Sequence, residues 1–316
     1  MQEKIIPESG GKQEEIYNFS GQITETLIML LNNYIKFYEA KLKDGAEWHF
    51  GVSEIPTEFL KEKTNIGKIK TEVNFTYSLE NIINGKFETS KTILLNDDSY
   101  EITLLLSIKT QNDIKTFSYE LEEIVVHELH HAFRYIKTLN KNSKANALNK
   151  TKNFTWKQLQ LTIQDNPTIK EFMQMIYLSL PQEIEARVQE TATKLKYIKK
   201  TTPNQTIETL RQFQPLRDAK RMLNYSTKEI KKIDPEVIKP FVNAFNKNLK
   251  TLSEYNIKNT TESFFEYWGK IIRNKGDVLF KKILRLVADK YQVKNENVLI
   301  TEIDEKLLKD ISGYEF

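Results

Sequence analysis

The chain has 316 residues, no cysteine and a formal net charge of +4. That length is enough for two domains, and the composition, with 39% hydrophobic and 28% charged residues, excludes a disordered or fibrous chain. Because cysteine is absent, disulfides and thiolate metal sites are excluded, so a bound metal must be held by imidazole and carboxylate groups.

The charge and the hydropathy pattern indicate which partners to expect. A surplus of +4 spread along the chain lacks the clustered Lys and Arg of a nucleic-acid site, so we expect no nucleic-acid partner. The longest apolar run, Leu27–Leu31, is too short to cross a bilayer, and we see no signal peptide, so we expect a cytoplasmic protein without a membrane partner. Seven arginines against forty lysines are typical of an AT-rich bacterial or phage gene, which makes a virion the alternative location.

The first predicted element is an amphipathic helix at Gly21–Lys43, after a polar tail at residues 1–20. Its apolar residues recur at the three-and-four spacing of a helix, with Ser20 as the N-cap and Asp44-Gly45 as the end.

Strands are predicted next, because the hydrophobic period changes from three-and-four to two. The period-two segments are Ile69–Tyr77, Lys86–Leu95, which is the weakest of them, and Tyr100–Ile108. Turn residues at Asn84-Gly85 and Asn96-Asp97-Asp98 favour hairpins, so we expect a small antiparallel sheet.

From Ser118 onward the sequence predicts helices, separated by an exposed loop at Asn140–Asn153. The helical segments are Ser118–Leu139, Thr168–Leu178, Leu180–Lys199 and several between Thr206 and Tyr291. The expected fold is therefore α+β, with a small antiparallel sheet, a central helix and a mainly α-helical C-terminal half. We expect three parts, listed here by residue number: a tail at 1–20, a mixed domain at 21–200 and a helical domain at 201–316.

The strongest motif for chemistry lies in the predicted central helix. Three of the four histidines are His127, His130 and His131, and with Glu128 they form H-E-x-x-H. At about 100° per residue, His127 and His131 share one helix face. The opposite face is apolar: Val125, Leu129, Ala132 and Ile136. Imidazoles four residues apart can share one zinc ion, and the Glu beside the first His can act as general base toward an attacking water.

The segment Ile124–Phe133 resembles the active-site helix of zincin metallopeptidases. The resemblance implies a Zn²⁺ cofactor, His127 and His131 as metal ligands, and Glu128 as the catalytic base for hydrolysis of peptide bonds. It also implies a third protein ligand from a later helix. Because neither His nor Cys follows the motif, this ligand is expected to be a carboxylate.

Two residues of the segment Ser179–Glu190 are candidates for the third ligand. Glutamate-type zincins often carry E-x-x-A-D or E-x-x-A-N in this helix, and the resemblance favours Glu183, with Ala186 three residues later. Arg187 stands where that pattern has Asp or Asn. Helical periodicity does not decide, and the more apolar flank favours Glu185 as the alternative.

Two weaker expectations concern the surroundings of the motif. The strand Tyr100–Ile108 precedes the motif helix and resembles the zincin edge strand that aligns an extended substrate. Arg134 and Tyr135 lie one turn beyond His131, where a donor can stabilise an oxyanion.

The sequence leaves two functions open. The first is a zinc-dependent peptidase that acts on an intracellular protein or peptide substrate. The alternative is a structural or assembly protein, such as a phage virion component, that keeps a zincin-like domain and binds protein partners through its C-terminal helices.

Overall fold

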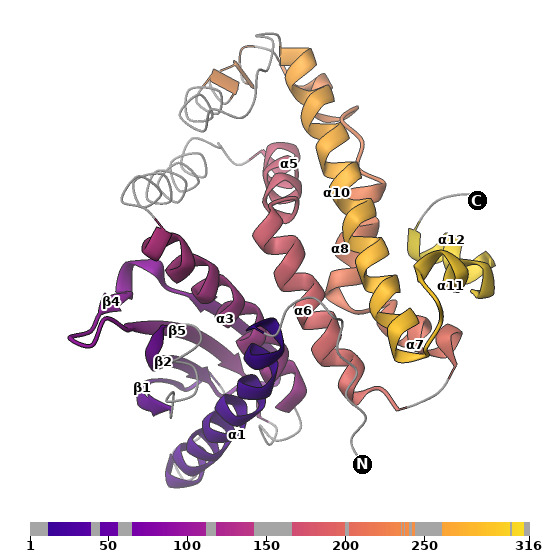
Figure 1. Cartoon of the computed structure of the whole chain (residues 1–316). Helices are drawn as coiled ribbons and strands as arrows, with labels where there is room; N and C mark the ends of the chain where they lie inside the picture. The colour runs from indigo at the N-terminus through magenta and orange to yellow at the C-terminus, as the bar shows by residue number, and fades with distance from the viewer. Residues whose placement is uncertain are drawn as a thin grey trace. The chain divides into compact units, whose positions relative to one another are not determined.

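The computed structural model describes eleven stretches of the chain: residues 12–38, 45–55, 65–111, 118–141, 166–199, 202–234, 236, 238–239, 242–243, 261–303 and 305–312. The chain divides into two compact units (Figure 1). The first contains residues 1–140 and 185–200, and the second contains 141–184 and 201–316. Most of the predicted loop at Asn140–Asn153 lies outside the described residues.

The first unit contains a five-stranded sheet in the order β1-β2-β5-β3, with β4 also paired to β5. The strands are β1 (Glu47–Ile55), β2 (Ile66–Thr76), β3 (Ile82–Phe87), β4 (Ile93–Leu94) and β5 (Tyr100–Lys109). β2 and β5 are parallel, whereas the other pairs are antiparallel. The predicted all-antiparallel sheet is therefore wrong: β3 and β4 lie in the connection between β2 and β5, which makes it long enough for a parallel pair.

The pairing also corrects the predictions for single strands. Asn84-Gly85 lies inside β3 and is not a turn. The predicted strand Lys86–Leu95 is interrupted: its first two residues end β3, a short 3-10 helix follows at Thr89–Lys91, and Ile93–Leu94 forms β4. The turn predicted at Asn96-Asp97-Asp98 is confirmed, with Asp98 at a φ of 59°. β5 pairs on both sides and is not an edge strand, whereas β3 ends the strand order. β1 was missed by the sequence analysis.

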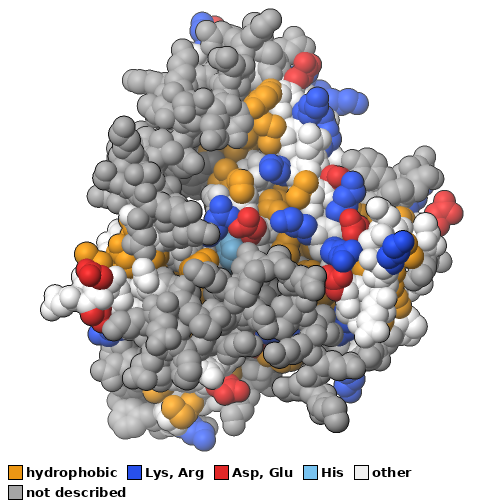
Figure 2. Space-filling view, in the orientation of Figure 1, with side chains coloured by type: hydrophobic (Ala, Val, Ile, Leu, Met, Phe, Trp, Pro, Cys, Tyr) orange, Lys and Arg blue, Asp and Glu red, His pale blue; other side chains and the backbone are white. Residues whose placement is uncertain are grey.

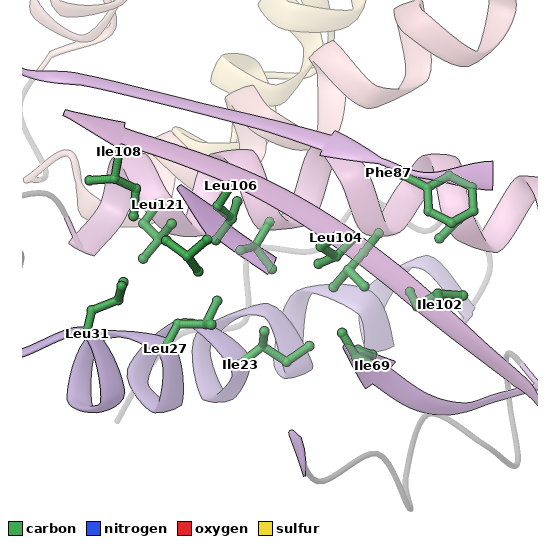
Figure 3. Packing of buried hydrophobic residues seen from close by; sticks show 14 of the residues in the cluster. Ile23, Leu27, Leu31, Ile69, Phe87, Ile102, Leu104, Leu106, Ile108 and Leu121 are labelled. Carbon is green, nitrogen blue, oxygen red and sulfur yellow. The ribbon is translucent and has the colours of Figure 1, made fainter. Parts of the chain in front are cut away.

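Two helices pack on the apolar face of this sheet. α1 (Lys12–Tyr38) and α3 (Ser118–Lys141) share one hydrophobic core with β2, β3 and β5. Figure 3 shows the side chains of Ile23, Leu27 and Leu31 on α1 directed toward those of the sheet. The apolar residues that recur with the helical period in α1 and with a period of two in β2 and β5 therefore pack together in one layer of buried side chains.

The start of α1 differs from the prediction. α1 begins at Lys12 and runs through Ser20, so Ser20 is not an N-cap. Its side chain is buried, and its hydroxyl donates a hydrogen bond of 3.0 Å to Glu122 of α3. Serine is common at helix N-caps, and for this reason a buried serine inside the helix was predicted to be its start. Asp44, in the predicted end at Asp44-Gly45, lies outside the described residues, as do residues 39–43 before it.

The second unit is helical in the part that the structure describes. Its helices are α5 (Pro167–Leu178), α7 (Pro203–Leu210), α8 (Gln214–Leu223), α10 (Thr261–Lys290), α11 (Glu296–Glu302) and α12 (Glu305–Ser312). Three buried aromatic rings form part of its core. The ring centroid of Phe172 lies 6.0 Å from that of Phe264 and 5.2 Å from that of Phe265. The α+β class and the mainly helical C-terminal half are confirmed.

α6 (Pro181–Tyr197) is one continuous helix, and the boundary between the two units falls within it, between Ile184 and Glu185. Among the described helices, none is both long enough and apolar enough to cross a membrane. On the face drawn in Figure 2, basic and acidic side chains are interspersed, and a histidine side chain reaches the surface.

Candidate metal centre

α3 separates its apolar and polar residues as the helical wheel predicts. Val125, Leu129, Ala132 and Ile136 are buried in the core of the first unit. His127 and His131 lie one helical turn apart on another face and are partly exposed. Core packing thus holds the helix by its apolar face and leaves the two imidazoles outside the core.

The two imidazoles converge through their Nε2 atoms, which are 3.0 Å apart. The ring centroids are separated by 4.8 Å, and the ring planes cross at 73°. Two nitrogens bound to one tetrahedral zinc ion, each about 2.0–2.1 Å from the metal, would lie about 3.4 Å apart. The observed separation is close to this value, so a small adjustment of the side chains suffices for both nitrogens to bind one ion.

The third member of this group is Glu183, in the first turn of α6. Its side chain is buried, and one ligand atom from each of His127, His131 and Glu183 lies within 4.8 Å of the other two. Two imidazoles and one carboxylate form a donor set that suits zinc and leaves a coordination position for a water or a substrate. These residues therefore fit a metal ion by the chemistry of their donor atoms.

Glu185, the alternative third ligand, has different partners. Its Oε2 lies 3.3 Å from Nε2 of His130 and also pairs with the guanidinium of Arg134. The hydrogen bond from His130 lowers the pKa of Glu185 to about 2, burial opposes this shift, and the charge of Arg134 adds to it. Arg134, which the sequence analysis considered as an oxyanion donor, is thus engaged by Glu185.

Glu128 is held by the edge strand of the sheet. Its Oε2 accepts a hydrogen bond of 2.6 Å from the backbone N–H of Phe87, the last residue of β3. Burial raises the pKa of Glu128, and the charge of His127 and the Phe87 hydrogen bond oppose this shift only in part. Helical spacing alone does not predict this contact. The sequence carried one sign of it, because a glycine inside a strand often marks a close approach of another chain segment.

That glycine is Gly85. A Cβ atom at this position would lie 2.3 Å from Cγ2 of Ile124 and 3.3 Å from Cγ of Glu128. β3 therefore passes α3 at a distance that only glycine allows, and this approach brings the Phe87 N–H to the Glu128 carboxylate.

Glu190 was also missed by the sequence analysis. Its Oε2 lies 3.4 Å from Nδ1 of His127 and accepts a hydrogen bond of 2.8 Å from Nη1 of Arg187. Burial raises the pKa of Glu190, but the charge of Arg187 and the contact with His127 outweigh it, so the pKa is lowered. Arg187 thus belongs to a pair of opposite charges beside the first histidine.

The two histidines of the motif differ in their electrostatic surroundings. Burial lowers the pKa of both, but for His127 the contact with Glu190 outweighs burial and the pKa is raised. For His131 the pKa lies well below the ordinary value, because the charge of His127 adds to burial. Neutral imidazole is the form that binds a metal.

Comparisons with protein-family models, curated proteins and solved structures gave no match to this chain. The His-His-Glu group, which can hold a metal ion, is therefore the main indication of function in this chain.

Proposed function

We propose that this protein is a zinc-dependent peptidase of the glutamate-type zincin kind, in which His127, His131 and Glu183 hold Zn²⁺ and Glu128 is the general base. The observation that carries the proposal is the convergence within 4.8 Å of ligand atoms from His127 and His131 of α3 and from Glu183 of α6. α3 also carries Glu128, next to the first ligand. A carboxylate adjacent to the first of two such histidines lies beside the open position of the metal.

Bound zinc would polarise the attacking water and the carbonyl of the substrate. Glu128 would take the proton from that water and pass it to the amine that leaves when the peptide bond breaks. The hydrogen bond from the Phe87 N–H to Oε2 restrains the Glu128 carboxylate and supports Oε1 as the oxygen that would take the proton. A protein or peptide is the substrate class, since its amide bond needs both an activated water and a proton for the leaving nitrogen.

The test combines metal content with a conservative variant of the base. We expect the wild type, purified without added metal, to contain about one zinc per chain. Glu128→Gln should keep the metal and the fold but lose hydrolysis by about 10² to 10⁴-fold, because an amide cannot accept the proton. Glu120→Gln, two turns earlier on α3, is the matched control and should keep activity.

A broad peptide library, digested with and without a chelator, provides the activity readout. Cleavage that stops with the chelator and with Glu128→Gln would support the proposal. A zinc-loaded wild type that cleaves no peptide would contradict it and favour the assembly role, with binding through the C-terminal helices.

A further inference from the structure

The two ring nitrogens of His127 have different neighbours. Nε2 lies 3.0 Å from Nε2 of His131, within the candidate metal group. Nδ1, on the other side of the ring, lies 3.4 Å from Oε2 of Glu190 on α6. A separation of 3.4 Å is long for a hydrogen bond, and contacts in metal-free and substrate-free sites often shorten when the site is filled.

Glu190 is almost completely buried, so its negative charge needs compensation. Arg187, one turn earlier on α6, provides it through the hydrogen bond from Nη1 to the same Oε2 atom that faces His127. The guanidinium therefore restrains the carboxylate oxygen at the place where the imidazole can donate to it.

We infer that Glu190 is a positioning residue of the metal site and that Arg187 holds it in place. Glu190 accepts the Nδ1–H of His127, which selects the tautomer whose Nε2 lone pair faces the metal. This inference rests on the proposed function. Such outer carboxylates orient a metal-binding histidine and increase its basicity.

The inference also gives Arg187 a role. In the zincin-like sequence pattern its position is expected to hold Asp or Asn, and the arginine here seemed a departure. In the structure the acidic side chain that faces the histidine comes from Glu190, one turn later, and Arg187 is its counter-charge.

The experiment measures zinc affinity by competition with a chromogenic chelator. Glu190→Ala should weaken zinc binding by about 10 to 100-fold. Glu190→Gln should recover part of this loss, because its amide oxygen can still accept the Nδ1–H. Glu122→Ala is the matched control: Glu122 is a buried carboxylate of α3 that accepts hydrogen bonds from Ser20 and Tyr197, and its loss should leave the zinc affinity unchanged.

Arg187 is tested by a double-mutant cycle. Arg187→Ala should weaken zinc binding, and the double variant Arg187→Ala/Glu190→Ala should be little worse than Glu190→Ala, because the two residues act as a unit. If Arg187 instead acts directly on the substrate, Arg187→Ala would lower kcat with unchanged zinc affinity, and its part in the inference would be wrong.

A second readout does not depend on loaded enzyme or on the variants. In the zinc-free wild type, ¹⁵N NMR of the His127 ring, recorded at a pH at which it is neutral, should show the proton on Nδ1. A predominant Nε2–H form would overturn the inference. It would also be overturned if Glu190→Ala kept a zinc affinity within about twofold of the wild type, because the expected loss is about 10-fold or more. Both results would leave the proposed function intact, whereas a wild type that binds no zinc would overturn the function itself.

Discussion

The carboxylate of Glu128 and the backbone N–H of Phe87 are joined by a hydrogen bond of 2.6 Å between α3 and the edge strand β3. This bond ties the orientation of the proposed base to the position of one strand. It forms because Gly85 lets β3 lie against α3, so a residue two positions from Phe87 controls the surroundings of Glu128.

The first prediction follows from that approach. Gly85→Ala places a Cβ atom 2.3 Å from Cγ2 of Ile124, so β3 or α3 must shift. We expect a loss of stability of about 1–3 kcal/mol from overpacking and a loss of hydrolysis, because the Phe87 hydrogen bond to Glu128 is displaced. Thermal unfolding and a peptide-cleavage assay measure the two effects.

Gly51→Ala is the matched control. Gly51 also lies in a strand, β1, but a Cβ atom there would meet no atom within 4 Å. If both variants lost the same amount of stability, the general cost of replacing a strand glycine, and not the approach of β3 to α3, would explain the effect.

The sequence predicted those parts of the fold that are encoded locally. The apolar face of α3 and the period of two in β2 and β5 could be predicted, because the buried residues of a helix or strand recur in the sequence with the period of that element. The strand pairing was not readable. Whether β2 lies parallel to β5 depends on the path of the intervening residues. Asn84-Gly85, a typical turn pair, lies inside β3, where Gly85 faces Ile124 of α3.

The candidate site divides in the same way. The motif spacing was sufficient to place His127 and His131 on one face, since both belong to one helix. Glu183 and Glu185 both lie close to Ile184 on α6, so only the packing of α6 distinguishes them. Glu190 was missed for the same reason: its relation to His127 is a contact between two helices, and sequence spacing within one helix does not describe it.

The second prediction separates the two acidic residues of α6. Glu183→Gln should weaken zinc binding strongly, because it removes the charge from one of three ligand atoms that lie together. Glu185→Gln should leave most of the affinity, because Glu185 contacts His130 and Arg134. Metal content after dialysis is the measurement. Equal small effects at both positions would mean that the third ligand lies elsewhere.

The third prediction concerns removal of the metal. A ligand that binds only the folded state stabilises it by about 2.7 kcal/mol when present at about 100 times its dissociation constant. A chelator should therefore lower the Tm of the wild type, and added zinc should restore it. The His127→Ala variant should show no such shift. As the control, His49→Ala removes a histidine that contacts Asn74 in the sheet, and it should respond to the chelator as the wild type does.

The last prediction concerns the pH dependence of stability and Glu123 on α3. Burial raises the pKa of Glu123 from 4.5 to about 8; the charge of Lys194 opposes this shift, and the charges of Glu190 and Glu120 add to it. Between these two pH values the folded chain holds a proton at Glu123 that the unfolded chain has released. The stabilising contribution of this group is therefore complete below about pH 4.5 and is lost as the pH rises to about 8.

Glu123→Gln should remove this dependence, since a neutral amide replaces the carboxyl that would have to ionise in a buried position. The free energy of unfolding, measured by denaturant titration at several pH values, should fall less steeply for Glu123→Gln than for the wild type between pH 4.5 and about 8. Glu88→Gln is the control: burial raises the pKa of Glu88, but hydrogen bonds from Ser90 and Lys86 outweigh it, so its pKa is lowered and its titration lies below this range. If the free energy of unfolding of the wild type and of Glu123→Gln changed equally with pH, Glu123 would already be ionised in the folded chain. Its ion pair with Lys194, with 3.5 Å between Nζ and Oε1, would then outweigh burial.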